Sequence, residues 1–87
     1  MNIILSKNNL SHIYNKHGIT ELQILSILNN ADVVTKTSIN VKYYYKDNYV
    51  VIVTRPNKNK EWYLKTAYQD TLRGYILGKI IYQKEVI

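Results

Sequence analysis

The hydrophobic pattern of this 87-residue chain changes its period near residue 33, and this change constrains the fold more than any other feature. Before residue 33, apolar residues recur roughly every three to four positions, which is the spacing of amphipathic helices. After it, they alternate with polar residues in short runs separated by turn-forming residues, as is typical of strands. We therefore predict one α+β domain, residues 1–87, with two N-terminal helices packed on a three- to four-stranded antiparallel sheet and a short C-terminal helix or strand.

The two helices have clear start and stop signals. The first is expected over residues 8–17, because its apolar residues share one face and Gly18 is a typical residue to end a helix. The second is expected over residues 21–30, since Thr20 and Gln23 have the spacing of a capping box. Apolar residues cover most of the second helix, so we expect it to be the more buried of the two.

Three strands are predicted over residues 39–46, 49–55 and 61–68, with a short turn at Asp47 and Asn48. In the first strand two sets of side chains alternate between the faces: Ile39, Val41, Tyr43 and Tyr45 on one, and Asn40, Lys42, Tyr44 and Lys46 on the other. The side chains expected to share one face of the third strand are Trp62, Leu64, Thr66 and Tyr68.

The C-terminal segment fits two predictions. Residues 70–84 have an approximately helical spacing of apolar residues, although Gly74 and Gly78 each weaken a helix by about 1 kcal/mol relative to Ala. Residues 80–87 equally fit an edge strand. The pattern alone leaves both alternatives open.

The charge of the chain favours a polyanionic partner such as RNA. Twelve Lys and Arg residues against six Asp and Glu residues give a net charge of +6. Only two of these cations are Arg, and Lys does not form the paired contacts to base edges that Arg forms, so sequence-specific reading of a DNA major groove is not expected. The absence of Cys excludes a disulfide scaffold, a thiolate zinc site and a thiol nucleophile.

The chain contains the groups that metal-independent RNA cleavage needs. A base removes the 2′-hydroxyl proton, the oxygen attacks the adjacent phosphorus, an acid protonates the leaving 5′-oxygen, and a cation stabilises the transition state. Histidine suits both proton transfers because its unperturbed pKa is about 6.5. The candidate catalytic residues are His12, Lys16, His17, Thr66 and Tyr68. The candidate substrate-binding residues are Lys42, Tyr44 and Arg55.

Each candidate also has an ordinary structural interpretation. His17 falls within the apolar stripe of the first predicted helix, whereas His12 and Lys16 fall on its polar face. Thr66 and Tyr68 are common strand residues. A regular helix separates the two histidines, so either only one of them is catalytic, or the helix ends early and His17 turns outward.

Two short segments resemble a known group of nucleases. The order of helices and sheet, with SHIYNKHG at residues 11–18 and TAY at residues 66–68, is similar to the phage-associated branch of the barnase/EndoU/colicin/RelE-like nucleases. The resemblance covers roughly residues 10–68. It implies a metal-independent ribonuclease that leaves a 2′,3′-cyclic phosphate.

The same resemblance implies roles for individual residues. It makes His17 the helix-borne histidine before a glycine, preceded by His12, and it makes Thr66 and Tyr68 the residues that hold the phosphate and pack against the base. The basic residue on a middle strand corresponds to Lys42 or Arg55. EndoU-like members usually have their two histidines on separate elements, whereas both lie on one predicted helix here.

We therefore expect a small endoribonuclease, acting as a toxin or as an effector of a phage or mobile element. Its expected substrate is RNA, with no metal and no other cofactor, and an antitoxin or immunity protein is a further expected partner. The apolar run at the start is too short for a signal peptide or membrane span, so we expect a cytoplasmic protein without membrane association. The alternative is a non-catalytic module that binds RNA or protein through its basic, tyrosine-rich surface, including an inhibitor of an acidic host protein.

Overall fold

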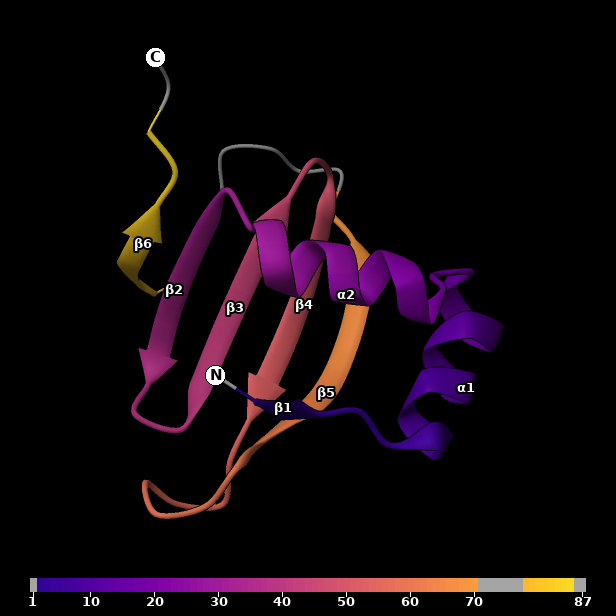
Figure 1. The fold of residues 1–87 in the computed structure, drawn as a ribbon, viewed down its shortest axis with the longest axis horizontal. Coiled ribbons are helices and arrows are strands. Elements are labelled where there is room, and N and C mark those ends of the chain that lie inside the picture. Colours follow the sequence, from indigo (N-terminus) through magenta and orange to yellow (C-terminus); the bar gives the residue numbers. More distant parts are fainter. Residues whose placement is uncertain (1, 71–77, 86–87) are drawn as a thin grey trace.

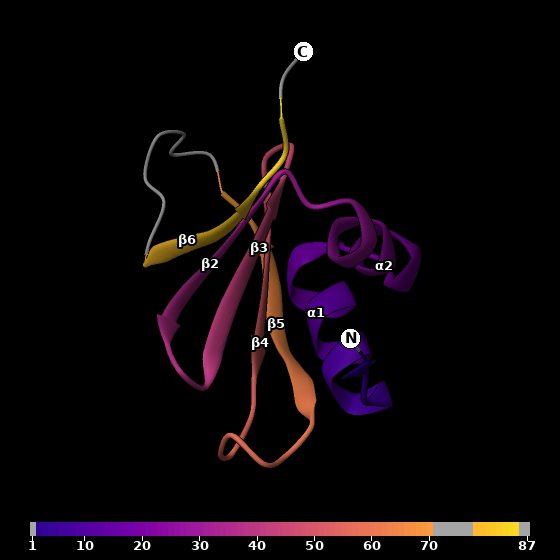
Figure 2. The same cartoon turned by 60° about the vertical axis from the view of Figure 1, so that its left-hand side comes forward.

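The computed structural model describes residues 2–70 and 78–85, which form two helices and six strands. The helices are α1 (Lys7–His17) and α2 (Glu21–Asn30). The strands are β1 (Ile3–Ile4), β2 (Val33–Ser38), β3 (Val41–Lys46), β4 (Tyr49–Thr54), β5 (Trp62–Gln69) and β6 (Lys79–Gln83). Both helices lie on one side of a single sheet, here called the helix face, and neither covers the opposite face (Figures 1 and 2). No helix in this described part is long and apolar enough to cross a membrane.

The helices begin and end where their local signals predict. Ser6 caps the start of α1, and Gly18 ends it in the left-handed conformation, with φ of 70° and its N–H donating to the Tyr14 carbonyl. Thr20 and Gln23 form both hydrogen bonds of the predicted capping box at the start of α2. The predicted range of α2 is confirmed, and α1 extends one residue further at its start than predicted.

The sheet is mixed and has more strands than predicted. Its order is β1-β5-β4-β3-β2-β6, in which β2 to β5 form the expected antiparallel meander. The prediction of three to four antiparallel strands is wrong because β1 pairs in parallel with β5, and β6 pairs with β2. Both additional strands lie at edges and pair with distant segments, which local periodicity does not reveal.

The C-terminal segment ends in a strand. β6 confirms the edge-strand prediction and begins one residue earlier than expected, at Lys79. The helical alternative rested mainly on residues 71–77, which lie outside the described residues.

The core lies between the helix face and the two helices. Its buried members include Ile13 of α1, Ile24 and Ile27 of α2, and Val34, Tyr44, Val51, Val53, Leu64 and Ala67 of the sheet. Tyr44 pairs with Val51 and is only 6% exposed, so its ring is a core side chain. The predicted alternation is confirmed for residues 41–46 by the pairing of β3 with β4, whereas Ile39 and Asn40 lie in the turn before this strand. The set containing Lys42 and Tyr44 is the one that faces the helices.

The burial of Tyr44 predicts a loss of stability at alkaline pH. Burial raises the pKa of the Tyr44 phenol above its ordinary value of 10.0, so folding favours the neutral form. This contribution to stability is fully present below pH 10.0 and is lost as the pH rises through the raised value. In urea unfolding at increasing pH, Tyr44→Phe should therefore lose stability less steeply than the wild type. Tyr82→Phe, at a position 52% exposed, should follow the wild type; equal slopes for all three proteins would contradict the prediction.

Candidate functional site

An extra residue in β5 determines which of its side chains face away from the helices. The pairing with β4 passes from Leu64 to Thr66, so Lys65 forms a β-bulge. A bulge shifts the alternation of faces by one residue, and it places Leu64 on the helix face but Thr66 and Tyr68 on the opposite face. Trp62 and Leu64 share the helix face as predicted, but the prediction that Thr66 and Tyr68 share it with them is wrong, because a period of two does not anticipate an inserted residue.

Thr66 and Tyr68 lie on the same face as two tyrosines of β3. Thr66 and Tyr43 are opposite the same β4 residue, and Tyr68 and Tyr45 are opposite another, so the four side chains form two cross-strand rows. The rings of Tyr43 and Tyr45 stack with centroids 6.3 Å apart and an interplanar angle of 19°. We call these four residues the tyrosine surface.

The helix α1 lies along the edge of β5 and brings His17 to this surface. β1 pairs only with the first two residues of β5, and next to them the Asn9 side-chain amide donates to the Leu64 carbonyl at 2.6 Å. From Asn9 to His17 the helix rises roughly 12 Å, and from Leu64 to Tyr68 the strand advances roughly 13 Å. The helix and the strand therefore reach the same level, where the His17 and Tyr68 ring centroids are 6.5 Å apart at 48°.

The environment of Tyr68 keeps its hydroxyl protonated. Burial raises the pKa of Tyr68 above its ordinary value, and the nearby Tyr43, Asp70 and Tyr45 raise it further. A tyrosine phenol is protonated at neutral pH in any case, and the raised pKa extends the pH range over which the Tyr68 hydroxyl can donate a hydrogen bond. A neutral donor beside an exposed imidazole is suited to holding an anionic group such as a phosphate.

The other two helix-borne candidates are exposed. His12 precedes His17 by five residues, which corresponds to about 140° around the helix axis, so the two imidazoles leave α1 in different directions. Lys16 directly precedes His17 in the last turn of α1. Within residues 2–70 and 78–85 no group of three or more His, Cys, Asp and Glu side chains could hold a metal ion.

The candidate substrate-binding residues lie elsewhere in the fold. Lys42 and Arg55 are both placed over the ring of Trp62, with the Lys42 Nζ 4.6 Å and the Arg55 Cζ 4.4 Å from the ring centroid. Trp62 belongs to the core on the helix face, as Tyr44 does. The structure therefore brings His17, Thr66 and Tyr68 together, and it places Lys42, Tyr44 and Arg55 apart from them.

Two side chains of the tyrosine surface were not among the predicted site residues. Tyr43 and Tyr45 are two positions apart in a strand, so their shared face could have been inferred from the sequence. Their proximity to Tyr68 depends on the strand order β5-β4-β3, which the sequence pattern does not specify.

Comparison with protein-family models, with curated proteins and with solved structures finds no match to this chain.

The bond between Asn9 and Leu64 should contribute measurably to stability. Asn9→Ala removes the side-chain donor and should lower the free energy of unfolding by about 1 kcal/mol, the usual net value of such a hydrogen bond. Asn8→Ala, on the preceding exposed residue, provides the control because both changes alter helix propensity equally. Urea unfolding of the pair gives the difference, and equal stabilities would show that the bond does not anchor α1.

Arg55 holds two loops together, which predicts a structural cost for its replacement. Its guanidinium donates to the Ile39 carbonyl at 2.8 Å, the Asn40 Oδ1 at 3.3 Å and the Lys58 carbonyl at 3.4 Å. Arg55→Lys cannot reproduce this planar set of donors and should lower the free energy of unfolding by about 1–3 kcal/mol. Lys58→Ala is the control, because Arg55 bonds only the backbone carbonyl of Lys58. The stability of this variant in urea should match that of the wild type.

Proposed function

We propose that the protein is a small metal-independent endoribonuclease that cleaves single-stranded RNA and leaves a 2′,3′-cyclic phosphate. The observation that carries the proposal is the position of the exposed His17 imidazole, 6.5 Å from the Tyr68 ring and beside the tyrosine surface. The resemblance of SHIYNKHG and TAY to the phage-associated barnase/EndoU/colicin/RelE-like nucleases assigns His17, Thr66 and Tyr68 to one site, and this proximity supports that assignment.

In the proposed reaction, His17 is the general base. Its neutral imidazole takes the proton of the 2′-hydroxyl, and the 2′-oxygen forms a bond to phosphorus as the bond to the 5′-oxygen breaks. The leaving 5′-oxygen takes a proton from water. The Tyr68 hydroxyl donates a hydrogen bond to a phosphoryl oxygen, and Lys16 provides the nearby positive charge for the transition state.

The tyrosine surface supplies a place for a base next to the reacting phosphate. Aromatic rings stack on unpaired bases of any identity, and each stack contributes about 1–3 kcal/mol. Tyr43 and Tyr45 are already parallel to within 19°, and they lie across β4 from Thr66 and Tyr68. This arrangement favours a single strand with unstacked bases over a duplex.

The proposed activity also suggests a biological context. A ribonuclease that attacks the RNA of the cell that makes it must be neutralised there, so we include an antitoxin or immunity protein as a partner. A toxin, or an effector of a phage or mobile element, is the corresponding role. The net charge of +6 favours an acidic surface on that partner.

The activity is tested by incubating the purified protein with mixed cellular RNA in EDTA and analysing the product ends. Cleavage to cyclic phosphate ends is expected for the wild type. His17→Ala should lower the rate by about 10²–10⁴-fold, the usual contribution of a general base. Tyr68→Phe removes only the hydroxyl and should lower the rate by about 10- to 100-fold, because a hydrogen bond to a charged group contributes about 1.5–3 kcal/mol.

His12→Ala is the matched control. It removes the other imidazole of α1, which has no ring contact with Tyr68 among the described residues, and it should keep nearly full activity. Thermal unfolding of each variant separates loss of chemistry from loss of fold. Full activity of His17→Ala would contradict the assignment, and tight RNA binding without cleavage by the wild type would favour the non-catalytic binding module.

A further inference from the structure

Three lysines form a row across neighbouring strands of the helix face. Lys79 of β6 pairs directly with Lys36 of β2, and Lys36 pairs directly with Lys42 of β3. Directly paired residues of antiparallel strands point to the same face, with Cβ atoms about 4.5–5.5 Å apart. The contact of Lys42 with the core residue Trp62 shows that this is the helix face. We call these three residues the lysine row.

A fourth cation extends the row at its β3 end. The Arg55 guanidinium lies over the same Trp62 ring as the Lys42 ammonium. Burial lowers the pKa of Lys42, and the positive charges of Lys36 and Arg55 lower it further. The neighbours that shift this pKa are therefore both cations, and positive charge is concentrated along one line.

Neither helix covers the lysine row. Figure 1 shows α2 crossing the opposite ends of β3 and β4, while α1 lies beside β5, so the end of β2 and the start of β3 are free of helices. Lys79 is exposed, and Lys36 and Lys42 are half-buried. A ligand can approach the row without any rearrangement of the helices.

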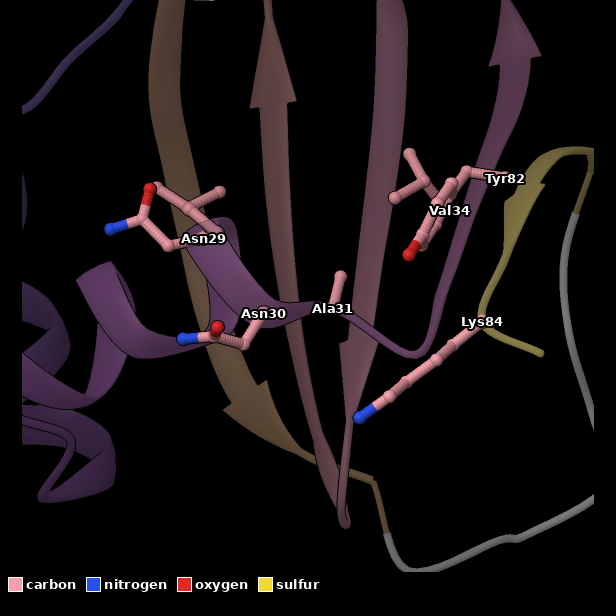
Figure 3. Close-up of a pocket in the computed structure, with 7 residues that line it drawn as sticks. Asn29, Asn30, Ala31, Val34, Tyr82 and Lys84 are labelled. Atoms are coloured by element: carbon pink, nitrogen blue, oxygen red, sulfur yellow. The ribbon is translucent and has the colours of Figure 1, made fainter. Parts of the chain in front are cut away.

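A hollow lies further along the same face, between the end of α2 and the strands β2 and β6. It has a volume of about 420 Å³, and its lining includes Asn29, Asn30, Val34, Tyr82 and Lys84. Figure 3 shows the Lys84 side chain extending from β6 toward the part of the hollow formed by the end of α2. The hollow therefore adds a further cation, an aromatic ring and two amides to the surface that begins at the lysine row.

This arrangement of positive charges favours the binding of an anion. Like charges directly opposite one another destabilise an antiparallel pair, and the row contains two such pairs in succession. An extended polyanion, with regularly repeated phosphates, matches a line of cations better than a single small anion does. Lysine is suited to this task because it attracts phosphate as a point charge without selecting a sequence.

We propose that the lysine row and the adjacent hollow bind the backbone of single-stranded RNA at a distance from the phosphate that is cleaved. This inference rests on the proposed function for the identity of the RNA as the substrate. Three strand spacings separate β5 from β2, which corresponds to roughly 14 Å, and the two sites are on opposite faces. Only an RNA long enough to pass around the sheet reaches both, so the row raises the affinity for long substrates and leaves short ones unaffected.

The binding is tested on the inactive His17→Ala protein with a fluorescein-labelled polyuridine strand at a series of salt concentrations. Removing three charges with Lys36→Gln, Lys42→Gln and Lys79→Gln together should lower the slope of log affinity against log salt by about 2, since each phosphate contact on a single strand contributes about 0.7. Trp62 is the only tryptophan and touches Lys42, so RNA binding should also change its emission.

The control removes the same charge elsewhere. Lys7→Gln, Lys60→Gln and Lys65→Gln together change three exposed lysines outside the row and should leave the slope nearly unchanged. Lys79→Glu alone provides a second change, at an exposed position, and should weaken binding more than Lys60→Glu does. Equal slopes for the two triple variants, or no binding of polyuridine by the parent at low salt, would overturn the proposal.

A cleavage experiment separates this inference from the proposed function. In the active protein, the row variant should cleave long RNA less efficiently than the wild type and a dinucleotide equally well. Row-dependent binding without any cleavage by the wild type would leave the surface established and the ribonuclease proposal wrong. Cleavage that requires His17, together with a salt slope that does not depend on the lysine row, would support the ribonuclease proposal and overturn the proposal for the row.

Discussion

The docking of α1 along the edge of β5 is the constraint on which the candidate site depends. β1 pairs with only the first two residues of β5, and the Asn9 amide bonds the next carbonyl, that of Leu64. An exposed strand edge is otherwise open to pairing with another chain, so the helix both protects the edge and aligns His17 with Tyr68. Gly18 ends the helix at this level, which leaves the imidazole at the border of the opposite face.

The β-bulge at Lys65 separates the molecule into two surfaces with different chemistry. It turns Thr66 and Tyr68 away from the helices, toward the stacked Tyr43 and Tyr45. The cations of β2, β3 and β6 remain on the helix face, at the side of the sheet farthest from α1. The imidazole and aromatic groups, which are suited to proton transfer and base stacking, therefore lie on a different face from the lysines, which are suited to binding phosphate. A long, flexible polyanion can contact both surfaces, which is consistent with the proposed substrate.

The sequence predicted some of these features and missed others for identifiable reasons. His17, Thr66 and Tyr68 were named as candidates from their chemistry and motif, but their proximity is a property of the packed structure. Tyr44 was expected at a binding surface, yet its strand turns that side chain into the core. A strand pattern defines two faces without stating which one meets the helices, because both faces of β3 contain tyrosines and both are partly apolar.

The sequence by itself determined the local features: the two helices and their caps, the left-handed Gly18, the turn after β3, and the α+β order. These depend on hydrogen bonds and steric preferences within a few residues, which the local residue types specify. Only the tertiary structure decided the parallel pairing of β1, the addition of β6, the face of Tyr68 and its contact with His17. Those features arise from pairing between segments that are distant in the chain. The gain in buried area and hydrogen bonds is shared among many residues, so a short sequence pattern does not predict it.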